Sequence, residues 1–126
     1  MKIHHVGIAC RNIEKAICSY GKLFHIVSQT DIVFDPEQNA NLCLVKTDTG
    51  LDVEFISGEQ VAGLLKTHIP YYHLCYEVDS IESTIRSFEE GGAFVVSSLK
   101  PAVLFSGKRV AFLMTKTGLI ELLEKL

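Results

Sequence analysis

The stretch YHLCYEVDSIE at 72–82 decides the fold, because HHVGIACRNIE at 4–14 matches it at a distance of 68 residues. Few residues are identical between the two stretches. The match lies in polar residues that occupy the same places inside apolar segments, and it continues one residue out of step near the end of each half. The aligned positions that matter most are His5 with His73 and Glu54 with Glu121. An internal repeat of this kind predicts two copies of one structural module.

Each half is predicted to form a βαβββ module. Module one covers about 1–58 and module two about 71–126, joined by a linker at about 59–70, and together they form a single domain. Asn12 and Ser80 are suitable N-caps for the two helices, and Gly91-Gly92 ends the second one. The apolar periodicity and the turn residues predict strands at 3–9, 26–33, 41–47, 52–57, 72–78, 93–98, 109–114 and 119–123, and a short connecting helix at 59–66.

Strand alternation predicts which side chains share a face. A helix on a sheet covers one face only, and successive strand residues point to opposite faces. Val6 and Ile8 belong to the helix side, so His5 points away from the helix. The same reasoning places three further polar residues on the helix-free side of their strands: Glu54, His73 and Glu121. The predicted fold class is α+β. If the two modules join into one curved eight-stranded mixed sheet, the helix-free face forms a cleft in which the four residues converge.

Two imidazoles and two carboxylates on one face are typical of a divalent-metal site. A buried carboxylate is costly unless it is paired, protonated or metal-bound. This donor set suits Mn, Fe, Co, Ni or Zn, and four protein ligands leave positions open for substrate. The plain alternative is that the histidines are ordinary partly buried residues and the glutamates are edge-strand charges.

Composition excludes several other classes of protein. The chain has 126 residues, 48% of them hydrophobic, and a formal net charge of −3 with no basic run, which argues against nucleic-acid binding. No secretory signal or membrane span is recognisable, so a cytoplasmic protein is expected. The four cysteines form no CxxC pair and are predicted to be reduced, with Cys43 and Cys75 lining the pocket. Lys108 and Arg109 are interpreted as part of a solvated hairpin rather than a phosphate site.

At these residues the sequence resembles the vicinal oxygen chelate superfamily, which includes glyoxalase I, methylmalonyl-CoA epimerase, antibiotic resistance proteins and extradiol dioxygenases. The resemblance covers essentially the whole chain, and its landmarks are HHVGIA at 4–9, LDVEFIS at 51–57, YHLCYEVDSIE at 72–82, and GKRVAFL with GLIELLEKL at 107–126. It implies a metal held by His5, Glu54, His73 and Glu121.

The resemblance also implies a reaction. Members of these branches remove a proton next to a carbonyl and stabilise the resulting enolate with the metal. Glu121 is expected to act as both ligand and acid/base, with Glu54 as the second catalytic candidate. The His/Glu/His/Glu set is similar to bacterial glyoxalase I (lactoylglutathione lyase), whereas HVGIA and GKRVAFL are closer to the epimerases. A homodimer and a small-molecule substrate, such as a thioester or thiol adduct, are further expectations.

Three departures from the family patterns leave the substrate open. The segment NLCLVK at 41–46 lacks the second acid/base carboxylate of epimerases, and Met114 stands where an epimerase typically has His. Ala9 replaces the arginine that helps glyoxalase I to bind glutathione. Two alternatives stay open: a metal-free protein that sequesters an antibiotic, and an Fe(II) extradiol dioxygenase, whose 2-His-1-carboxylate triad leaves no role for a fourth ligand.

Overall fold

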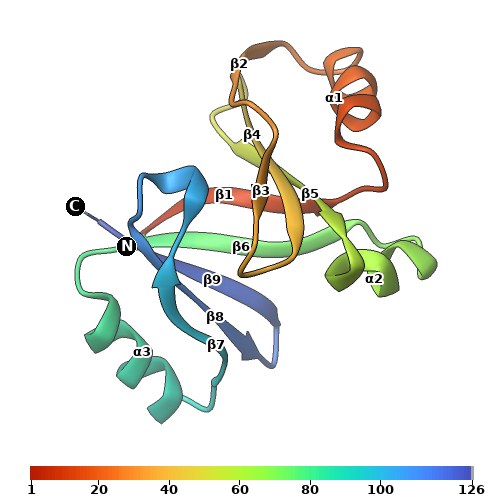
Figure 1. Cartoon of the computed structure of the whole chain (residues 1–126). Helices are drawn as coiled ribbons and strands as arrows, with labels where there is room; N and C mark the ends of the chain where they lie inside the picture. The colour runs from red at the N-terminus through yellow and green to blue at the C-terminus, as the bar shows by residue number, and fades with distance from the viewer. Residues whose placement is uncertain (126) are drawn as a thin grey trace. The chain divides into compact units, whose positions relative to one another are not determined.

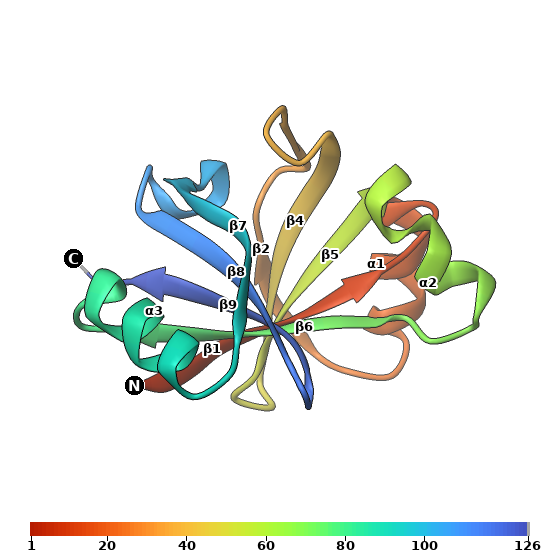
Figure 2. The same ribbon diagram turned by 90° about the horizontal axis from the view of Figure 1, so that it is seen from below.

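The computed structural model describes residues 1–125 and shows an α+β protein with mixed strand pairing (Figures 1 and 2). Within these residues there are three α-helices, α1 (Ile13–Gly21), α2 (Ala62–Lys66) and α3 (Ile81–Glu90), and two 3₁₀ turns, Glu59–Val61 and Val103–Phe105. The strands are β1 (Lys2–Ala9), β2 (Ile26–Gln29), β3 (Val33–Asp35), β4 (Ala40–Thr47), β5 (Asp52–Gly58), β6 (Tyr71–Val78), β7 (Phe94–Pro101), β8 (Arg109–Thr115) and β9 (Gly118–Glu124).

The chain divides into two compact units. The second unit has the order β-α-β-β-β, and the first has the same order except that the segment after its helix is divided into β2 and β3. The first unit is residues 5–72, and the second unit is residues 1–4 together with 73–125. In the first unit β1 pairs in parallel with β5, β5 pairs antiparallel with β4, and β4 pairs with both β2 and β3. In the second unit β6 pairs in parallel with β9, followed by β8 and β7 in antiparallel pairs.

Each unit has its own core between one helix and one face of its strands. In the first unit Ile13 of α1 packs with Val53 and Phe55 of β5, and Val6 and Ile8 lie against this cluster. In the second unit the corresponding cluster joins α3 to β6, β8 and β9, through Val78, Ile81, Ala111, Leu113 and Leu122. The face predicted from alternation to lie against the helix is therefore the buried apolar face in both units.

The predicted capping residues do lie at the ends of α1 and α3. The Asn12 side chain accepts a hydrogen bond of 2.8 Å from the backbone N–H of Lys15. Ser80 is the N-cap residue of α3 but makes no side-chain capping bond, and Gly91 is the C-cap. Only three residues separate β1 from α1 and two separate β6 from α3, and these short loops hold each helix against the strands of its own unit.

The predicted strand at 26–33 is wrong as a single element, because the chain leaves β4 after Thr30 and returns at Val33. Thr30 N–H still donates to the Leu44 carbonyl at 2.9 Å, but the Leu44 N–H donates to the Thr30 hydroxyl at 3.0 Å instead of to a backbone carbonyl. The Thr30 carbonyl accepts from the Cys43 thiol at 3.3 Å. These side-chain bonds interrupt the ladder and divide the segment into β2 and β3. The described strands therefore number nine rather than the eight that were predicted.

At Gly58, where the linker begins, the backbone passes very close to residues 39 and 40. Gly58 has φ of 150°, and a Cβ there would lie 2.9 Å from the Asn39 carbonyl oxygen. Val61 is fully buried, which fixes the following 3₁₀ turn and α2 at the end of β5. Among the described residues, none of the helices has the length and apolar character needed to cross a membrane.

Candidate functional site

The first unit holds a buried pair of one imidazole and one carboxylate. His5 lies on β1 and Glu54 on β5, and both are buried, at 0% and 3% exposure. The His5 Nε2 atom is 3.8 Å from Glu54 Oε1. Glu54 is opposite Gly7 in the parallel ladder, so the histidine comes two residues before the partner of the glutamate.

The second unit holds an equivalent pair. His73 lies on β6 and Glu121 on β9, again buried, at 4% and 2% exposure. The His73 Nε2 atom is 3.3 Å from Glu121 Oε1. Glu121 is opposite Cys75, so the histidine again comes two residues before the partner of the glutamate. The internal repeat seen in the sequence therefore reproduces one local geometry at a parallel strand pair.

Apolar neighbours shield the pair in the second unit. The ring of Phe112 meets the ring of His73 edge to face, with centroids 5.2 Å apart and planes at 89°. Phe112 is opposite Glu121 in the antiparallel ladder between β8 and β9. A charged group so surrounded is costly unless a partner of opposite charge accompanies it. In the first unit the buried Leu44 has the same place opposite Glu54.

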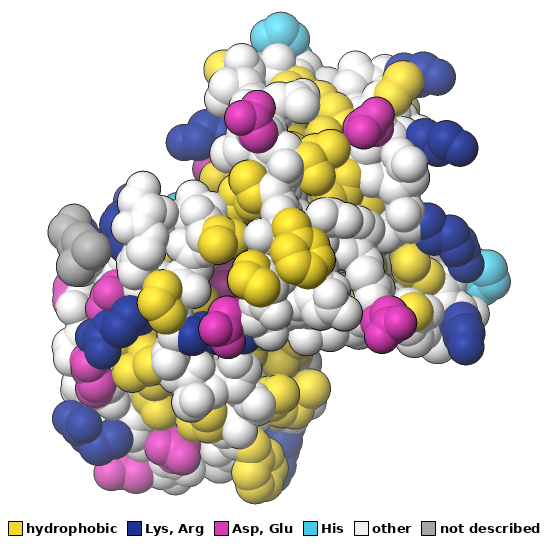
Figure 3. Space-filling model, viewed as in Figure 1, with side chains coloured by type: hydrophobic (Ala, Val, Ile, Leu, Met, Phe, Trp, Pro, Cys, Tyr) yellow, Lys and Arg dark blue, Asp and Glu magenta, His cyan; other side chains and the backbone are white. Residues whose placement is uncertain are grey.

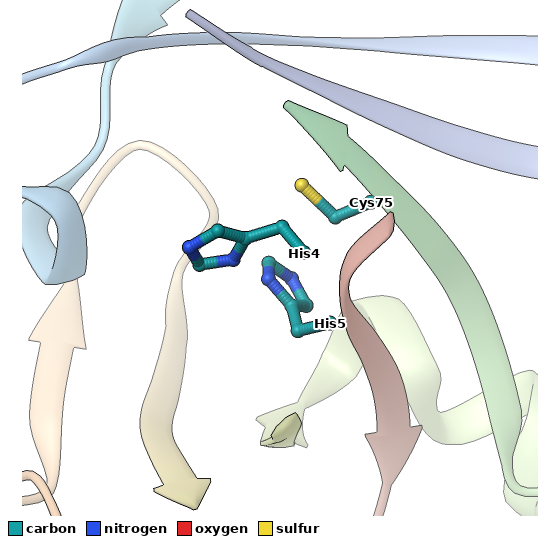
Figure 4. A group of neighbouring side chains, drawn as sticks. All are labelled: His4, His5 and Cys75. Carbon is teal, nitrogen blue, oxygen red and sulfur yellow. The ribbon is translucent and has the colours of Figure 1, made fainter. Parts of the chain in front are cut away.

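Two residues of the second unit lie close together: His4, which was not predicted to have a role, and Cys75, which was predicted to line the pocket. His4 lies on β1 immediately before His5, and Cys75 lies on β6 two residues after His73. Figure 4 shows His4 and Cys75 together with His5. The ring of His4 also meets the ring of Phe105 edge to face, with centroids 5.2 Å apart. A nitrogen of His4 lies within 4.8 Å of the Cys75 sulfur. The doublet His4-His5 was the only sequence signal for this arrangement. Cys75 lies in an apolar cluster that Phe105 covers.

The two other buried or half-buried thiols do not belong to the polar face. Cys43 lies in the core under α1, so its predicted place in a pocket is wrong: residue 43 is opposite Phe55, which faces the helix. Burial raises the pKa of the Cys10 thiol to about 11, against its ordinary value of 9.0. None of the four cysteines forms a disulfide within residues 1–125, in agreement with the predicted reduced state. Nucleophilic chemistry is therefore not favoured at Cys10 or Cys43.

Arg109 is engaged within its own unit. Its side chain lies 2.9 Å from Glu124 Oε2 and 2.7 Å from Glu82 Oε1, and its backbone N–H donates to Glu124 at 2.8 Å. These bonds lower the pKa of the Glu124 carboxyl below its ordinary value. Such a doubly paired guanidinium agrees with the interpretation that Arg109 does not serve as a phosphate site.

The donor set fits a divalent metal ion. Each pair presents an imidazole Nε2 toward a carboxylate oxygen, and His, Glu, His and Glu are borderline-to-hard donors that suit Mn, Fe, Co, Ni and Zn. Each unit thus carries one buried His–Glu pair, on its first and its last strand, and paired modules with such positions are the class of protein that the fold and the site define.

Comparison with known proteins identifies the family. The family model described as the glyoxalase/bleomycin resistance protein/dioxygenase superfamily matches residues 4–112, so the chain belongs to this superfamily. The resemblance noted from the sequence motifs is thereby confirmed.

One relative in sequence is an epimerase. The chain is 27% identical over 123 residues to the ethylmalonyl-CoA/methylmalonyl-CoA epimerase of Cereibacter sphaeroides, across 91% of this chain and 89% of that protein.

Solved structures show the same fold. The methylmalonyl-CoA epimerase of Mycobacterium tuberculosis matches with a TM-score of 0.82 at 19% identity, over 98% of this chain and 87% of the other. A variant of the Streptomyces coelicolor methylmalonyl-CoA epimerase in complex with 2-nitronate-propionyl-CoA matches with a TM-score of 0.76 at 18% identity, over 99% and 94% of the two chains.

Proposed function

We propose that this protein is a divalent-metal-dependent epimerase that moves the proton next to the carbonyl of a coenzyme A thioester. The observation that carries the proposal is the repeated geometry of the two buried pairs, His5 with Glu54 and His73 with Glu121. The epimerase relative, which matches over most of its length, favours a thioester over the glutathione adduct of glyoxalase I. Ala9 supports the same choice, because a glutathione-binding arginine is missing there.

The four side chains of these pairs would hold one metal ion together. When bound, such an ion supplies positive charge that favours negative charge on a carbonyl oxygen of the substrate. His5 and His73 are neutral donors, and the two carboxylates would balance the charge of a divalent ion. A balanced set of this kind removes the cost of burying two carboxylates.

Proton transfer is the part of the reaction that we assign to the glutamates. Epimerisation needs a proton taken from the α-carbon on one face and returned on the other. Glu121 is our candidate for the acid/base and Glu54 for its counterpart, because both are buried carboxylates on the polar face of their strands. The surrounding apolar residues, such as Phe112 and Leu44, exclude water from these carboxylates and keep the exchanged proton within the site.

Metal content and α-proton exchange test the proposal together. Purified protein is expected to carry about one divalent ion per chain, and His73→Ala is expected to lose it. In deuterium oxide the metal-loaded protein should exchange the α-proton of methylmalonyl-CoA, and should leave the hemithioacetal of methylglyoxal and glutathione unchanged. Ser87→Ala, a substitution at an exposed residue of α3, serves as the matched control.

Three outcomes have different meanings. A protein that stays metal-free after titration with Ni, Co, Zn and Mn contradicts the proposal and favours the alternative of a small-molecule-binding resistance protein. Turnover of the hemithioacetal alone replaces the epimerase assignment by a glyoxalase one. A metal-loaded protein that exchanges neither substrate contradicts both activities.

A further inference from the structure

A groove with basic walls lies in the first unit, between α1 and α2. One part of it, about 480 Å³, is lined by Cys10, Arg11, Gly58, Glu59, Ala62, Leu65 and Lys66. An adjoining part, about 380 Å³, shares Cys10, Arg11 and Leu65 and continues along α1 past Lys15, Ala16 and Ser19. We call these two parts the basic groove. Lys and Arg side chains gather along this edge of the molecule, on the side of α1 and α2 (Figure 3).

The charges of the basic groove are unbalanced. Its walls carry Arg11, Lys15 and Lys66 against a single carboxylate, Glu59. Among the residues that the structure describes, none of these three cations has a carboxylate within 4.0 Å, whereas Arg109 has two. The chain as a whole has a net charge of −3, so the positive charge is local to this groove. Unpaired cations around a depression favour an anionic ligand.

Backbone hydrogen bonds, a helix cap and a buried residue fix the segments that form the walls of the groove. The Cys10 N–H donates to the Ile56 carbonyl at 2.9 Å, which fixes the turn that carries Arg11. Asn12 caps α1 immediately beyond it, and the buried Val61 fixes α2 on the other wall. Ala62 and Leu65 add an apolar surface beside the cations, which suits a planar, partly apolar group such as a purine base.

The groove lies too far from the His5–Glu54 pair for one small chemical group to contact both. Five residues of extended chain lead from His5 to Cys10, and four lead from Glu54 to Gly58. At ~3.3 Å per residue these paths are roughly 13–17 Å long. Because α1 lies on the face opposite this pair, a ligand that reaches both places passes round the ends of β1 and β5. Such a ligand is long and thin, with a reactive group at one end and negative charge at the other.

We propose that the basic groove binds the phosphate-bearing nucleotide end of coenzyme A, with Arg11, Lys15 and Lys66 facing its phosphates and Leu65 beside its adenine. This inference rests on the proposed function, because it is the thioester that requires a carrier of this length. Arg109, which is already paired with two glutamates, is not available for the same task.

Calorimetric titration with unacylated ligands tests the groove without any turnover. The parent protein is expected to bind coenzyme A and 3′,5′-ADP, and to bind pantetheine, which has no phosphate, far more weakly. The double variant Arg11→Gln/Lys66→Gln should weaken coenzyme A binding by about tenfold or more, since it removes two charge-assisted contacts. The matched control, Arg86→Gln/Lys116→Gln, also removes two exposed cations but lies outside the groove, so it should bind as the parent does.

The results of these measurements test the groove separately from the proposed epimerase activity. Equal weakening in both double variants, or none in the groove variant, overturns the proposal. Tight binding of 4′-phosphopantetheine with no gain from the nucleotide also overturns it, because the occupant would then be a carrier-protein arm. If coenzyme A binds the groove but no α-proton exchanges, the groove is supported and the proposed epimerase activity fails. If exchange occurs and the groove variant keeps the parent KM for methylmalonyl-CoA, the epimerase is supported and the groove fails.

Discussion

Glu121 is the residue on which the proposed chemistry depends most. The change Glu121→Gln keeps the size of a side chain that is 2% exposed, but it removes the carboxylate 3.3 Å from His73 Nε2. We expect α-proton exchange to fall by roughly 10²-fold or more, the usual scale for loss of a positioned acid/base. Exchange is measured by NMR in deuterium oxide, with metal content determined on the same sample.

The matched control for that substitution is Glu77→Gln on β6. Glu77 is a partly buried carboxylate of the same unit, but it lies 3.9 Å from the Lys2 ammonium and not in either His–Glu pair. The Glu77→Gln variant should exchange the α-proton of the substrate at the parent rate. Equal exchange by parent and Glu121→Gln at equal metal occupancy would remove Glu121 from the mechanism.

The face occupied by each of the four polar residues could be predicted from the sequence, because alternation along a strand follows from backbone geometry. The distances within each pair could not, since they depend on the register between β1 and β5 and between β6 and β9. The pairing of His4 with Phe105 was also beyond prediction, because the turn at 103–105 has no periodic pattern. Cys43 was misplaced because β4 is apolar on both faces, with Leu42 and Leu44 on one and Cys43 and Val45 on the other, so alternation does not tell the faces apart.

The bonds between Arg109 and Glu124 are expected to make the stability of the folded state depend on pH. Hydrogen bonds from Arg109 lower the pKa of Glu124 below 4.5, so the carboxylate stabilises the folded state above that pH. This contribution is lost as the pH falls through the lowered pKa. Arg109→Gln should therefore reduce the melting temperature at pH 7, and the difference from the parent should shrink between about pH 5 and pH 3.

Thermal unfolding followed by circular dichroism at several pH values measures this difference. Arg86→Gln is the control, because Arg86 is an exposed arginine of α3 with no ion pair among the described residues. A difference between Arg109→Gln and the parent that stays constant, or grows toward acid pH, would contradict the assignment of the stabilisation to these carboxylates.

At the scale of elements, the start of the linker depends on Gly58. Its φ of 150° and the 2.9 Å approach of a Cβ to the Asn39 carbonyl oxygen leave no room for a side chain. Gly58→Ala should therefore destabilise the fold by about 1–3 kcal/mol. It should also widen or distort the basic groove, because residue 58 is part of its wall.

Gly63→Ala is the matched control for Gly58→Ala. Gly63 lies inside α2, and a Cβ there meets nothing within 4 Å. Alanine favours a helix over glycine, so this variant should be as stable as the parent or more stable by up to ~1 kcal/mol. Urea unfolding compares the two, and equal midpoints for both variants would show that the approach at Gly58 relaxes at no cost.

Most helices and strands were predictable because nearby residues in the sequence determine them. Those that were not predictable depend on contacts between residues far apart in the sequence. The two long helices follow from apolar spacing and capping residues, and their positions are confirmed at Ile13–Gly21 and Ile81–Glu90. The division of the segment at 26–33 was not predictable, because it depends on Thr30 bonding to Leu44, fourteen residues away. Propensity alone favours one uninterrupted strand there.

At the scale of the whole molecule, exposed apolar side chains predict self-association. In the second unit β7 is an edge strand whose Phe94 and Val96 are 73% and 60% exposed. In the first unit β2 and β3 carry Val27 and Phe34, at 61% and 54% exposure. Apolar edges of this kind are usually covered. We therefore predict a homodimer, measured by light scattering at micromolar concentration.

Surface substitutions locate the contact. Phe94→Lys with Val96→Lys should shift the protein toward the monomer, while Lys116→Gln, which also alters an exposed residue of the second unit, should not. A monomeric parent protein would contradict the prediction. That the two units constitute a single domain stays a prediction, and one cooperative calorimetric transition is its expected sign.

The division of the chain at residues 4 and 72 has a consequence for synthesis on the ribosome. The first unit is continuous in sequence, from 5 to 72, so all of its strands are synthesised before the second half. The second unit needs residues 1–4, whose ion pair between Lys2 and Glu77 closes a long loop. Its last strand, β9, is also made last. Residues 1–4 must therefore wait for β6, and the second unit, which is completed only by β9, is the slower part to mature.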